Sequence, residues 1–148
     1  MNHFDIIIIG GGPAGAATAI RAARGGASVA IFEKAGEGRD KVCGDGLTPR
    51  AMGALDELKI DVNDAHKILG LRMIAGATRR ELEWPTGGKF PPYGAVWIRK
   101  ELDAHLIAAA TDAGAVLHYN CEALPDFDGE RVRGVTVGGE HWTADLVV

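Results

Sequence analysis

Three glycines near the N-terminus, Gly10, Gly12 and Gly15, follow the spacing G-x-G-x-x-G, which is typical of sites that bind the diphosphate of a dinucleotide. The first permits a tight turn, the second lets the backbone approach the diphosphate, and the third allows close contact between a helix and a strand. Pro13 and Ala14 lie between Gly12 and Gly15, and a proline is tolerated in the first turn of a helix because its missing N–H would have no partner there. The free N–H groups of that turn can hold an anion.

Glu33 is the next candidate for ligand binding. It lies eighteen residues after Gly15, at the end of an apolar run, where a carboxylate can accept hydrogen bonds from the hydroxyl groups of an adenosine ribose. An acid at this position disfavours a 2′-phosphate, which leaves FAD or NAD as the ligand. The alternative is a glycine turn that only connects a strand to a helix. The ordered succession of strand, glycines, helix, strand and acid favours dinucleotide binding.

Cys43 is one of only two cysteines and lies in the polar segment KVCGDG. Its neighbour Gly44 would let the backbone approach a planar ligand closely, and the ammonium group of Lys41 would favour the thiolate form of the cysteine. These residues predict a thiol beside a ligand and leave two roles open: participation in the chemistry, or packing of a small polarizable side chain. Cys121 lies in an apolar segment and is expected to be an inert core residue.

The elements that position these residues begin with a β-α-β unit. Phe4–Ile9 is an apolar run typical of a strand in a parallel sheet. A helix is expected from Ala14 to Gly25, and Val29–Phe32 is a second strand that ends at Glu33. After a glycine-rich loop at 34–49, the pattern predicts further elements: a helix at 51–58, strands at 69–75, 80–84 and 95–98, a helix from 99 to 114, a strand at 115–123 and an antiparallel meander at 126–148.

Composition and charge exclude several classes of protein. The chain has 148 residues, of which 47% are hydrophobic and 24% charged, as in ordinary globular proteins. A net charge of −4 without a basic stripe disfavours a nucleic-acid surface. The longest apolar run is shorter than the roughly 20 residues that span a bilayer, and the N-terminus lacks a basic signal segment. Two cysteines far apart favour a reducing, cytoplasmic setting.

The histidines give no reason to expect a metal site. Their positions lack the spacing of metal ligands, and each is expected at the surface or at an edge. The five are His3, His66, His105, His118 and His141.

The segments GGGPAGAATA, FEK and RDKVCGDGLTPRA resemble the geranylgeranyl reductase family of FAD-dependent oxidoreductases, within the wider class that includes para-hydroxybenzoate hydroxylase. The pattern R-x-K-x-C-G-x-G-L is more specific than the glycines, and the resemblance covers most of the chain. It implies an α/β fold: a Rossmann-like FAD-binding domain with a βαβ start and a β-meander, plus the beginning of an inserted substrate-domain sheet. The resemblance assigns residues 1–67 and 95–148 to the FAD-binding domain and 68–94 to the start of the substrate domain.

The resemblance also implies an FAD site. The loop with Cys43 and Gly44 would lie along the flavin, near a lipid-binding cavity, where the cysteine is a candidate catalytic residue. Arg99 would contact FAD, the alternative being a solvated surface arginine, and Ala123 would contact adenine through its backbone. The residues expected to bind FAD are Gly10, Gly12, Pro13, Ala14, Gly15, Glu33, Lys34, Lys41, Cys43, Gly44, Arg99 and Ala123.

Within this family the chain is most similar to the type that reduces a double bond in the isoprenoid tail of menaquinone. The resemblance implies a prenyl lipid or quinone as substrate and hydride transfer from reduced flavin as the reaction. The alternatives are a flavin-dependent aromatic hydroxylase and a non-catalytic nucleotide-binding module. The residues select neither NAD(P)H nor another reductant as electron donor, and they indicate no oligomeric state.

Members of this family are much longer than this chain. We therefore expect the N-terminal portion of an enzyme, a fragment or truncated product that is incomplete at its C-terminus. Such a fragment would be impaired in turnover on its own. The complete protein is expected to be cytoplasmic, with peripheral contact at the inner face of the membrane where its lipid substrate lies.

Overall fold

The computed structural model describes residues 2–148, and the contacts among them form two compact units. The first unit combines the segment up to residue 40 with residues 100–148, and the second consists of residues 41–99. These limits differ from the expected domain boundaries, after residue 67 and before residue 95, because β4 (His66–Ile68) pairs with β7 (Gly94–Val96) inside the second unit. The assignment of residue ranges to cofactor and substrate domains stays a prediction.

A six-stranded sheet forms the centre of the first unit, and its strands follow the order β8-β2-β1-β11-β10-β9. Its strands are β1 (His3–Ile9), β2 (Val29–Glu33), β8 (Val116–Tyr119), β9 (Ala123–Asp128), β10 (Arg131–Val137) and β11 (Glu140–Val147). β1 is parallel to both β2 and β11, and β2 is parallel to β8. β9, β10 and β11 form an antiparallel meander. The prediction of an α/β, Rossmann-like fold with a βαβ start and a β-meander is confirmed.

The β1-α1-β2 unit forms because an apolar strand is followed by glycines and then by a helix of small apolar residues. Helix α1 (Pro13–Arg24) packs against β1 and β2 and buries Ala16, Ala19 and Ile20. At its C-terminus the N–H of Gly25 donates to carbonyl groups of the preceding turn. The small side chains let the helix lie close to the sheet, which places the N-terminus of α1 at the end of β1.

A hydrophobic cluster joins the parallel strands to the meander. Its buried members are Ile7, Ala30, Phe32, Ala123, Val135 and Ala144. The ring of Phe32 also stacks on His118, with centroids 4.8 Å apart, and meets the edge of Trp142 at 5.1 Å. Fully burying a large apolar side chain stabilises a fold by about 1.5–3 kcal/mol. His118 lies on the edge strand β8, as expected, and its ring packs against the core residue Phe32.

The strand expected at 115–123 is wrong in its length. β8 ends at Tyr119 because Asn120 adopts a positive φ of 56°, which breaks the extended backbone. Asparagine tolerates this conformation better than most residues. Cys121 therefore lies in the link between two strands, where it is half-buried and packs against the hydrophobic cluster. Ala123 begins β9 instead of ending the preceding strand.

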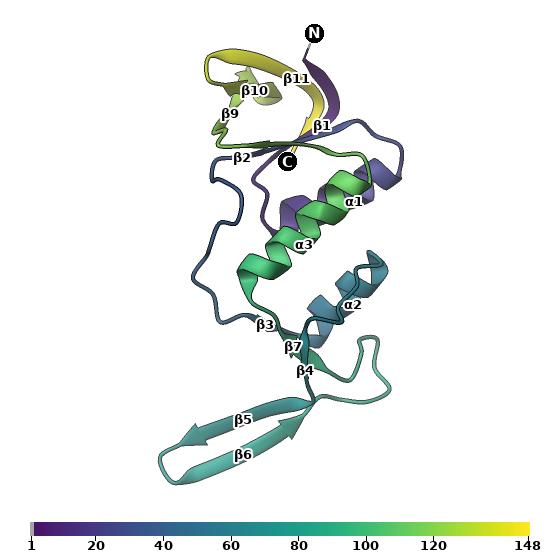
Figure 1. Cartoon of the computed structure of the whole chain (residues 1–148), viewed down its shortest axis with the longest axis vertical. Helices are drawn as coiled ribbons and strands as arrows, with labels where there is room; N and C mark the ends of the chain where they lie inside the picture. The colour runs from purple at the N-terminus through teal and green to yellow at the C-terminus, as the bar shows by residue number, and fades with distance from the viewer. Residues whose placement is uncertain (1) are drawn as a thin grey trace. The chain divides into compact units, whose positions relative to one another are not determined.

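The second unit contains a small sheet, a helix and a hairpin. The sheet has the order β3-β7-β4, and β3 is Gly46–Leu47. Helix α2 (Pro49–Glu57) begins after Thr48, whose hydroxyl accepts a hydrogen bond of 3.3 Å from the N–H of Ala51. The two strands expected at 69–75 and 80–84 are β5 (Gly70–Ala75) and β6 (Thr78–Glu83), which form an almost fully exposed antiparallel hairpin (Figure 1).

Helix α3 (Arg99–Asp112) starts at the last residue of the second unit and continues in the first. Across the described residues, no helix combines the length and the apolar character that crossing a membrane requires.

Candidate functional site

The glycine loop between β1 and α1 has the backbone geometry that anion binding requires. Gly10 adopts a φ of 107°, a region that residues with a Cβ atom rarely enter. A methyl group on Gly15 would lie 2.0 Å from the carbonyl oxygen of Gly10, so only glycine lets the helix approach this loop. Gly12 precedes the helix, Pro13 is its first residue, and within residues 2–148 no side chain caps this N-terminus. The first-turn N–H groups and the helix dipole can therefore attract an anion.

Glu33 ends β2, as predicted, and is 5% exposed. Its Oε2 atom accepts a hydrogen bond of 2.7 Å from the N–H of Gly11, and Oε1 accepts one of 2.9 Å from the N–H of Ala35. These two bonds fix the carboxylate beside the glycine loop. Because each carboxylate oxygen offers two acceptor positions, positions remain for the hydroxyl groups of a ligand.

A cavity of about 260 Å³ brings together four of the predicted site residues, Gly10, Glu33, Lys34 and Ala123. They come from distant parts of the chain and meet at the carboxyl ends of β1 and β2. The link before β9 is held there by a hydrogen bond of 3.0 Å from the N–H of Cys121 to the carbonyl of Glu33. In open α/β sheets, ligands bind in the crevice at this edge.

Sequence analysis assigns no role to two charged residues at this site, Arg39 and Asp103, although Arg39 is the first residue of the pattern R-x-K-x-C-G-x-G-L. Arg39 lines the cavity of about 260 Å³ and also a smaller one of about 30 Å³, which it shares with Asp103 and Tyr119. Its Nη1 atom lies 4.0 Å from Oε1 of Glu33, and its Nη2 atom lies 3.4 Å from Oδ2 of Asp103. Burial raises the pKa of Tyr119, and the charges of Glu37 and Glu33 raise it further. A signal for Asp103 exists in the sequence: it is a carboxylate among the apolar positions of a helix.

Cys43 is exposed and lies in the second unit beside Asp45 and Arg99. A hydrogen bond from the Asp45 backbone lowers the pKa of the Cys43 thiol most, and a hydrogen bond from the Arg99 side chain lowers it further. The sequence assigns this effect to Lys41, but the cation that the structure places at the sulfur is Arg99. Arg99 begins α3, as predicted, and its N–H donates a hydrogen bond of 3.0 Å to Oδ1 of Asp45. An acid thus caps this helix terminus, which was unforeseen from sequence.

The predicted cofactor residues divide between the two units. The first unit holds Gly10, Gly12, Pro13, Ala14, Gly15, Glu33, Lys34 and Ala123, and the second holds Lys41, Cys43, Gly44 and Arg99. A methyl group built on Gly44 would meet no other atom within 4 Å, so its backbone is open to close approach. The part that each residue plays in binding stays a prediction.

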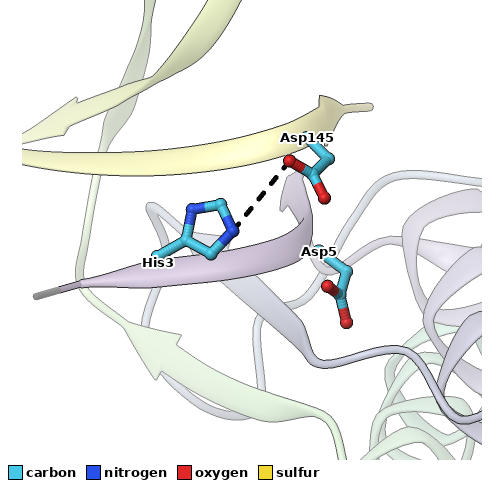
Figure 2. Close-up of side chains that lie close together, drawn as sticks. All are labelled: His3, Asp5 and Asp145. Carbon is cyan, nitrogen blue, oxygen red and sulfur yellow. Dashed lines mark ion pairs between the residues drawn. The ribbon is translucent and has the colours of Figure 1, made fainter.

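A group of acidic and imidazole side chains that the sequence spacing missed lies on β1 and β11. Figure 2 shows His3, Asp5 and Asp145, whose potential ligand atoms all lie within 4.8 Å of one another. The parallel pairing of the two strands brings them together, and His3 Nε2 lies 4.0 Å from Asp145 Oδ1. All three are exposed, and Asp5 accepts hydrogen bonds from the N–H and the hydroxyl of Ser28 at 2.7 and 2.8 Å. The bonds of Asp5 connect β1 to Ser28, the residue that precedes β2.

The residues of the first unit fit the ADP half of FAD. The uncapped N-terminus of α1 offers N–H donors for a diphosphate, and a methyl group on Gly12 would meet only Arg39, at 3.7 Å, so the approach to the loop is open. The anchored carboxylate of Glu33 offers acceptors for ribose hydroxyls, and the adjoining cavity offers space beside Lys34 and Ala123. The donors thus suit the diphosphate, the acceptors suit the ribose, and the adjoining space suits the base.

A parallel sheet with an open glycine loop and an acid at the end of its second strand defines a dinucleotide-binding protein of the Rossmann type. The chain belongs to the FAD dependent oxidoreductase family, whose model matches residues 5–148. It is 41% identical over 122 residues to the menaquinone reductase of Mycobacterium tuberculosis, an alignment that covers 81% of this chain and 30% of that protein. It is 35% identical over 142 residues to digeranylgeranylglycerophospholipid reductase 1 of Methanopyrus kandleri, covering 93% of this chain and 36% of that protein.

Among solved structures, a geranylgeranyl bacteriochlorophyll reductase-like protein from Thermoplasma acidophilum matches with a TM-score of 0.82 and 28% identity. That match covers 99% of this chain and 38% of the other. The chain therefore spans about a third of the length of these proteins. The resemblance to geranylgeranyl reductases that the sequence motifs indicate is confirmed.

Proposed function

We propose that this chain is the FAD-binding portion of a reductase that saturates double bonds in prenyl lipids, with the isoprenoid tail of menaquinone as the first candidate substrate. The similarity to a menaquinone reductase and to a digeranylgeranylglycerophospholipid reductase supports the substrate class. The observation that carries cofactor binding is the convergence of Gly10, Glu33, Lys34 and Ala123 on one cavity beside an uncapped helix N-terminus.

In this proposal the diphosphate of FAD is held at the start of α1, by the backbone of Gly12, Pro13 and Ala14. The dipole of the helix and its free N–H groups favour a negative charge there. Gly10 and Gly15 keep the loop and the helix close enough for this approach. Glu33 accepts hydrogen bonds from the ribose hydroxyls, while Lys34 and the backbone of Ala123 line the space for the adenine.

Reduced flavin, when bound, supplies a hydride to one carbon of a double bond. The chain itself contributes residues that orient and protonate. Cys43 is our candidate for a catalytic side chain, because its thiol is exposed and the pKa of that thiol is lowered by the Asp45 backbone and by Arg99. A proton on this sulfur is easier to donate than one on an ordinary cysteine. Lys41 and Gly44 would contact the cofactor from the same loop.

The proposal divides the chain by role. Residues 1–67 and 95–148 would bind the cofactor, and residues 68–94 would begin the substrate domain. The hairpin β5-β6 lies in this second part and exposes Leu71, Met73 and Leu82, a surface suited to apolar substrates. A prenyl lipid or quinone would reach a cytoplasmic enzyme through peripheral contact with the membrane. The electron donor would be NAD(P)H or another reductant.

The test uses the polypeptide encoded by the complete gene, purified and incubated with FAD. We expect the absorbance of bound oxidised flavin, loss of that absorbance on anaerobic reduction, and its return when menaquinone is added. The menaquinone should gain two hydrogen atoms in its tail, as measured by mass spectrometry. A polypeptide that retains no flavin would contradict the proposal and favour a non-catalytic nucleotide-binding module. Reoxidation only by oxygen, with hydroxylation of an aromatic compound, would favour the hydroxylase instead.

A further inference from the structure

Asp103 is an acid on the buried face of α3. Its side chain is 12% exposed, and its helical neighbours Leu102, Leu106 and Ile107 are all buried apolar residues. A carboxylate is almost never buried to this extent unless a cation or hydrogen-bond donors compensate it. The burial of this carboxylate therefore destabilises helix α3 unless another residue compensates its charge.

Arg39 is that residue. It lies in the loop after β2, 64 residues before Asp103, and its Nη2 atom is 3.4 Å from Oδ2 of the acid. The same guanidinium has its Nη1 atom 4.0 Å from Oε1 of Glu33. Two carboxylates from different elements, one on β2 and one on α3, thus hold a single cation that is 31% exposed.

The guanidinium faces the glycine loop. A methyl group built on Gly12 would meet one atom within 4 Å, the Nη2 atom of Arg39 at 3.7 Å. Gly12 is the N-cap of α1, where the helix dipole already contributes partial positive charge. A cation beside this terminus is favourable only when negative charge is present as well. Asp103 and Glu33 provide it in this structure, and an anionic ligand would add to it.

We propose that Arg39 contributes to holding the diphosphate at the glycine loop and that Asp103 is a positioning residue, which fixes the Arg39 guanidinium over Gly12. This inference rests on the proposed FAD-binding function and assigns two residues that the sequence motifs leave without a role. The guanidinium supplies N–H donors in a planar fork, a geometry that suits phosphate oxygens. Asp103 removes the freedom that a long side chain on a loop would otherwise have.

The test compares ADP with adenosine in binding measurements by calorimetry, because the two differ only in the diphosphate. Arg39→Met is expected to weaken ADP binding by about 10- to 100-fold, the range for hydrogen bonds to charged groups, and to leave adenosine binding within about 3-fold. Asp103→Asn keeps the size of the side chain and should weaken ADP binding by a smaller factor, again with little change for adenosine. Arg131→Gln is the matched control, since it removes one positive charge from an exposed residue that lines neither cavity.

The double variant separates positioning from general damage. If Asp103 acts through Arg39, Asp103→Asn in the Arg39→Met background should weaken ADP binding no further. Equal losses for ADP and adenosine, or fully additive losses in the double variant, would overturn the inference. Circular dichroism spectra and thermal midpoints identify a variant that fails to fold. If Arg39→Met fails to fold, Arg39→Lys takes its place. We expect Arg39→Lys to lower the affinity for ADP and to leave the affinity for adenosine unchanged. Failure of the unchanged protein to bind FAD would instead overturn the proposed function.

Discussion

The backbone N–H of Gly11 donates a hydrogen bond of 2.7 Å to the carboxylate of Glu33, which lies 22 residues later in the chain. This bond ties the turn after β1 to the end of β2, the two strands between which helix α1 crosses. The acid that we propose for ribose binding is therefore also a structural residue of the loop that we propose for the diphosphate. A substitution of Glu33 should therefore affect both ligand binding and the stability of the loop.

Glu33→Gln is expected to lower the free energy of unfolding by about 1–3 kcal/mol, because one carboxylate acceptor becomes an amide donor that faces a buried N–H group. Urea denaturation followed by circular dichroism measures this. Glu140→Gln, an exposed change on β11, is the control and should leave the stability within about 0.5 kcal/mol. Equal midpoints for the two variants would show that the Glu33 bonds carry no stability.

Gly15→Ala and Gly12→Ala are expected to separate folding from ligand binding. The new methyl group at position 15 would lie 2.0 Å from the Gly10 carbonyl oxygen, so α1 must shift, at a cost of about 1–3 kcal/mol. At position 12 the methyl group would meet only the end of the Arg39 side chain, at 3.7 Å. Gly12→Ala should therefore keep its thermal midpoint and lose affinity for FAD. A lower midpoint for Gly12→Ala than for Gly15→Ala would contradict this geometry.

Cys43 is expected to react with iodoacetamide at lower pH than an ordinary thiol. The Asp45 backbone and the Arg99 side chain hold the pKa of Cys43 below its usual value of 9.0, so the reactive thiolate forms earlier as pH rises. Arg99→Gln should move the midpoint of the rate profile to higher pH, although the backbone bond from Asp45 remains. The measurement uses a Cys121→Ser background, so that Cys43 is the only cysteine that can react. An unchanged profile in Arg99→Gln would mean that the arginine does not stabilise the thiolate.

Asp5 is expected to stabilise the protein at neutral pH and not in strong acid. Hydrogen bonds from the N–H of Ser28 and then from its hydroxyl lower the pKa of Asp5 below its usual 3.8. Because the pKa of the folded state is the lower one, the stabilisation is present above pH 3.8 and is lost as pH falls through the folded value. Asp5→Asn should lower the thermal midpoint at neutral pH, and the difference from the unchanged protein should shrink in acid. Asp145→Asn, from the same exposed group (Figure 2), lacks the Ser28 bonds and should show a smaller difference.

The local part of the fold could be predicted from sequence. The β1-α1-β2 unit and the place of Glu33 follow from an apolar run, three glycines and a helix of small residues that succeed one another within 33 residues. The end of β8 could not, because nothing in an apolar pattern shows that Asn120 takes a positive φ. Likewise, the alternation of the meander predicts strands but does not show that β11 pairs in parallel with β1.

The candidate site follows the same division. Binding by backbone groups at Gly10, Gly12 and Gly15 could be predicted, because the spacing of these glycines is visible in the sequence. The pairing of Arg39 with Asp103 depends on how a loop and a helix 64 residues apart meet, and only coordinates give that. The cation at Cys43 has the same origin, since Lys41 is its neighbour in sequence and Arg99 is its neighbour in space.

The pairing of β1 with β11 has a consequence for synthesis on the ribosome. His3 lies opposite Thr143. The first strand to be translated, β1, therefore cannot complete its pairing until one of the last described strands has been synthesised. β2 can cover one edge of β1 within about 30 residues of translation, but the other edge stays open until residues 143–147 have emerged. Sheets assembled from such distant segments form slowly, and nascent chains with open strand edges are prone to misassembly. The nascent chain should therefore depend on chaperones that shield this edge until translation passes β11.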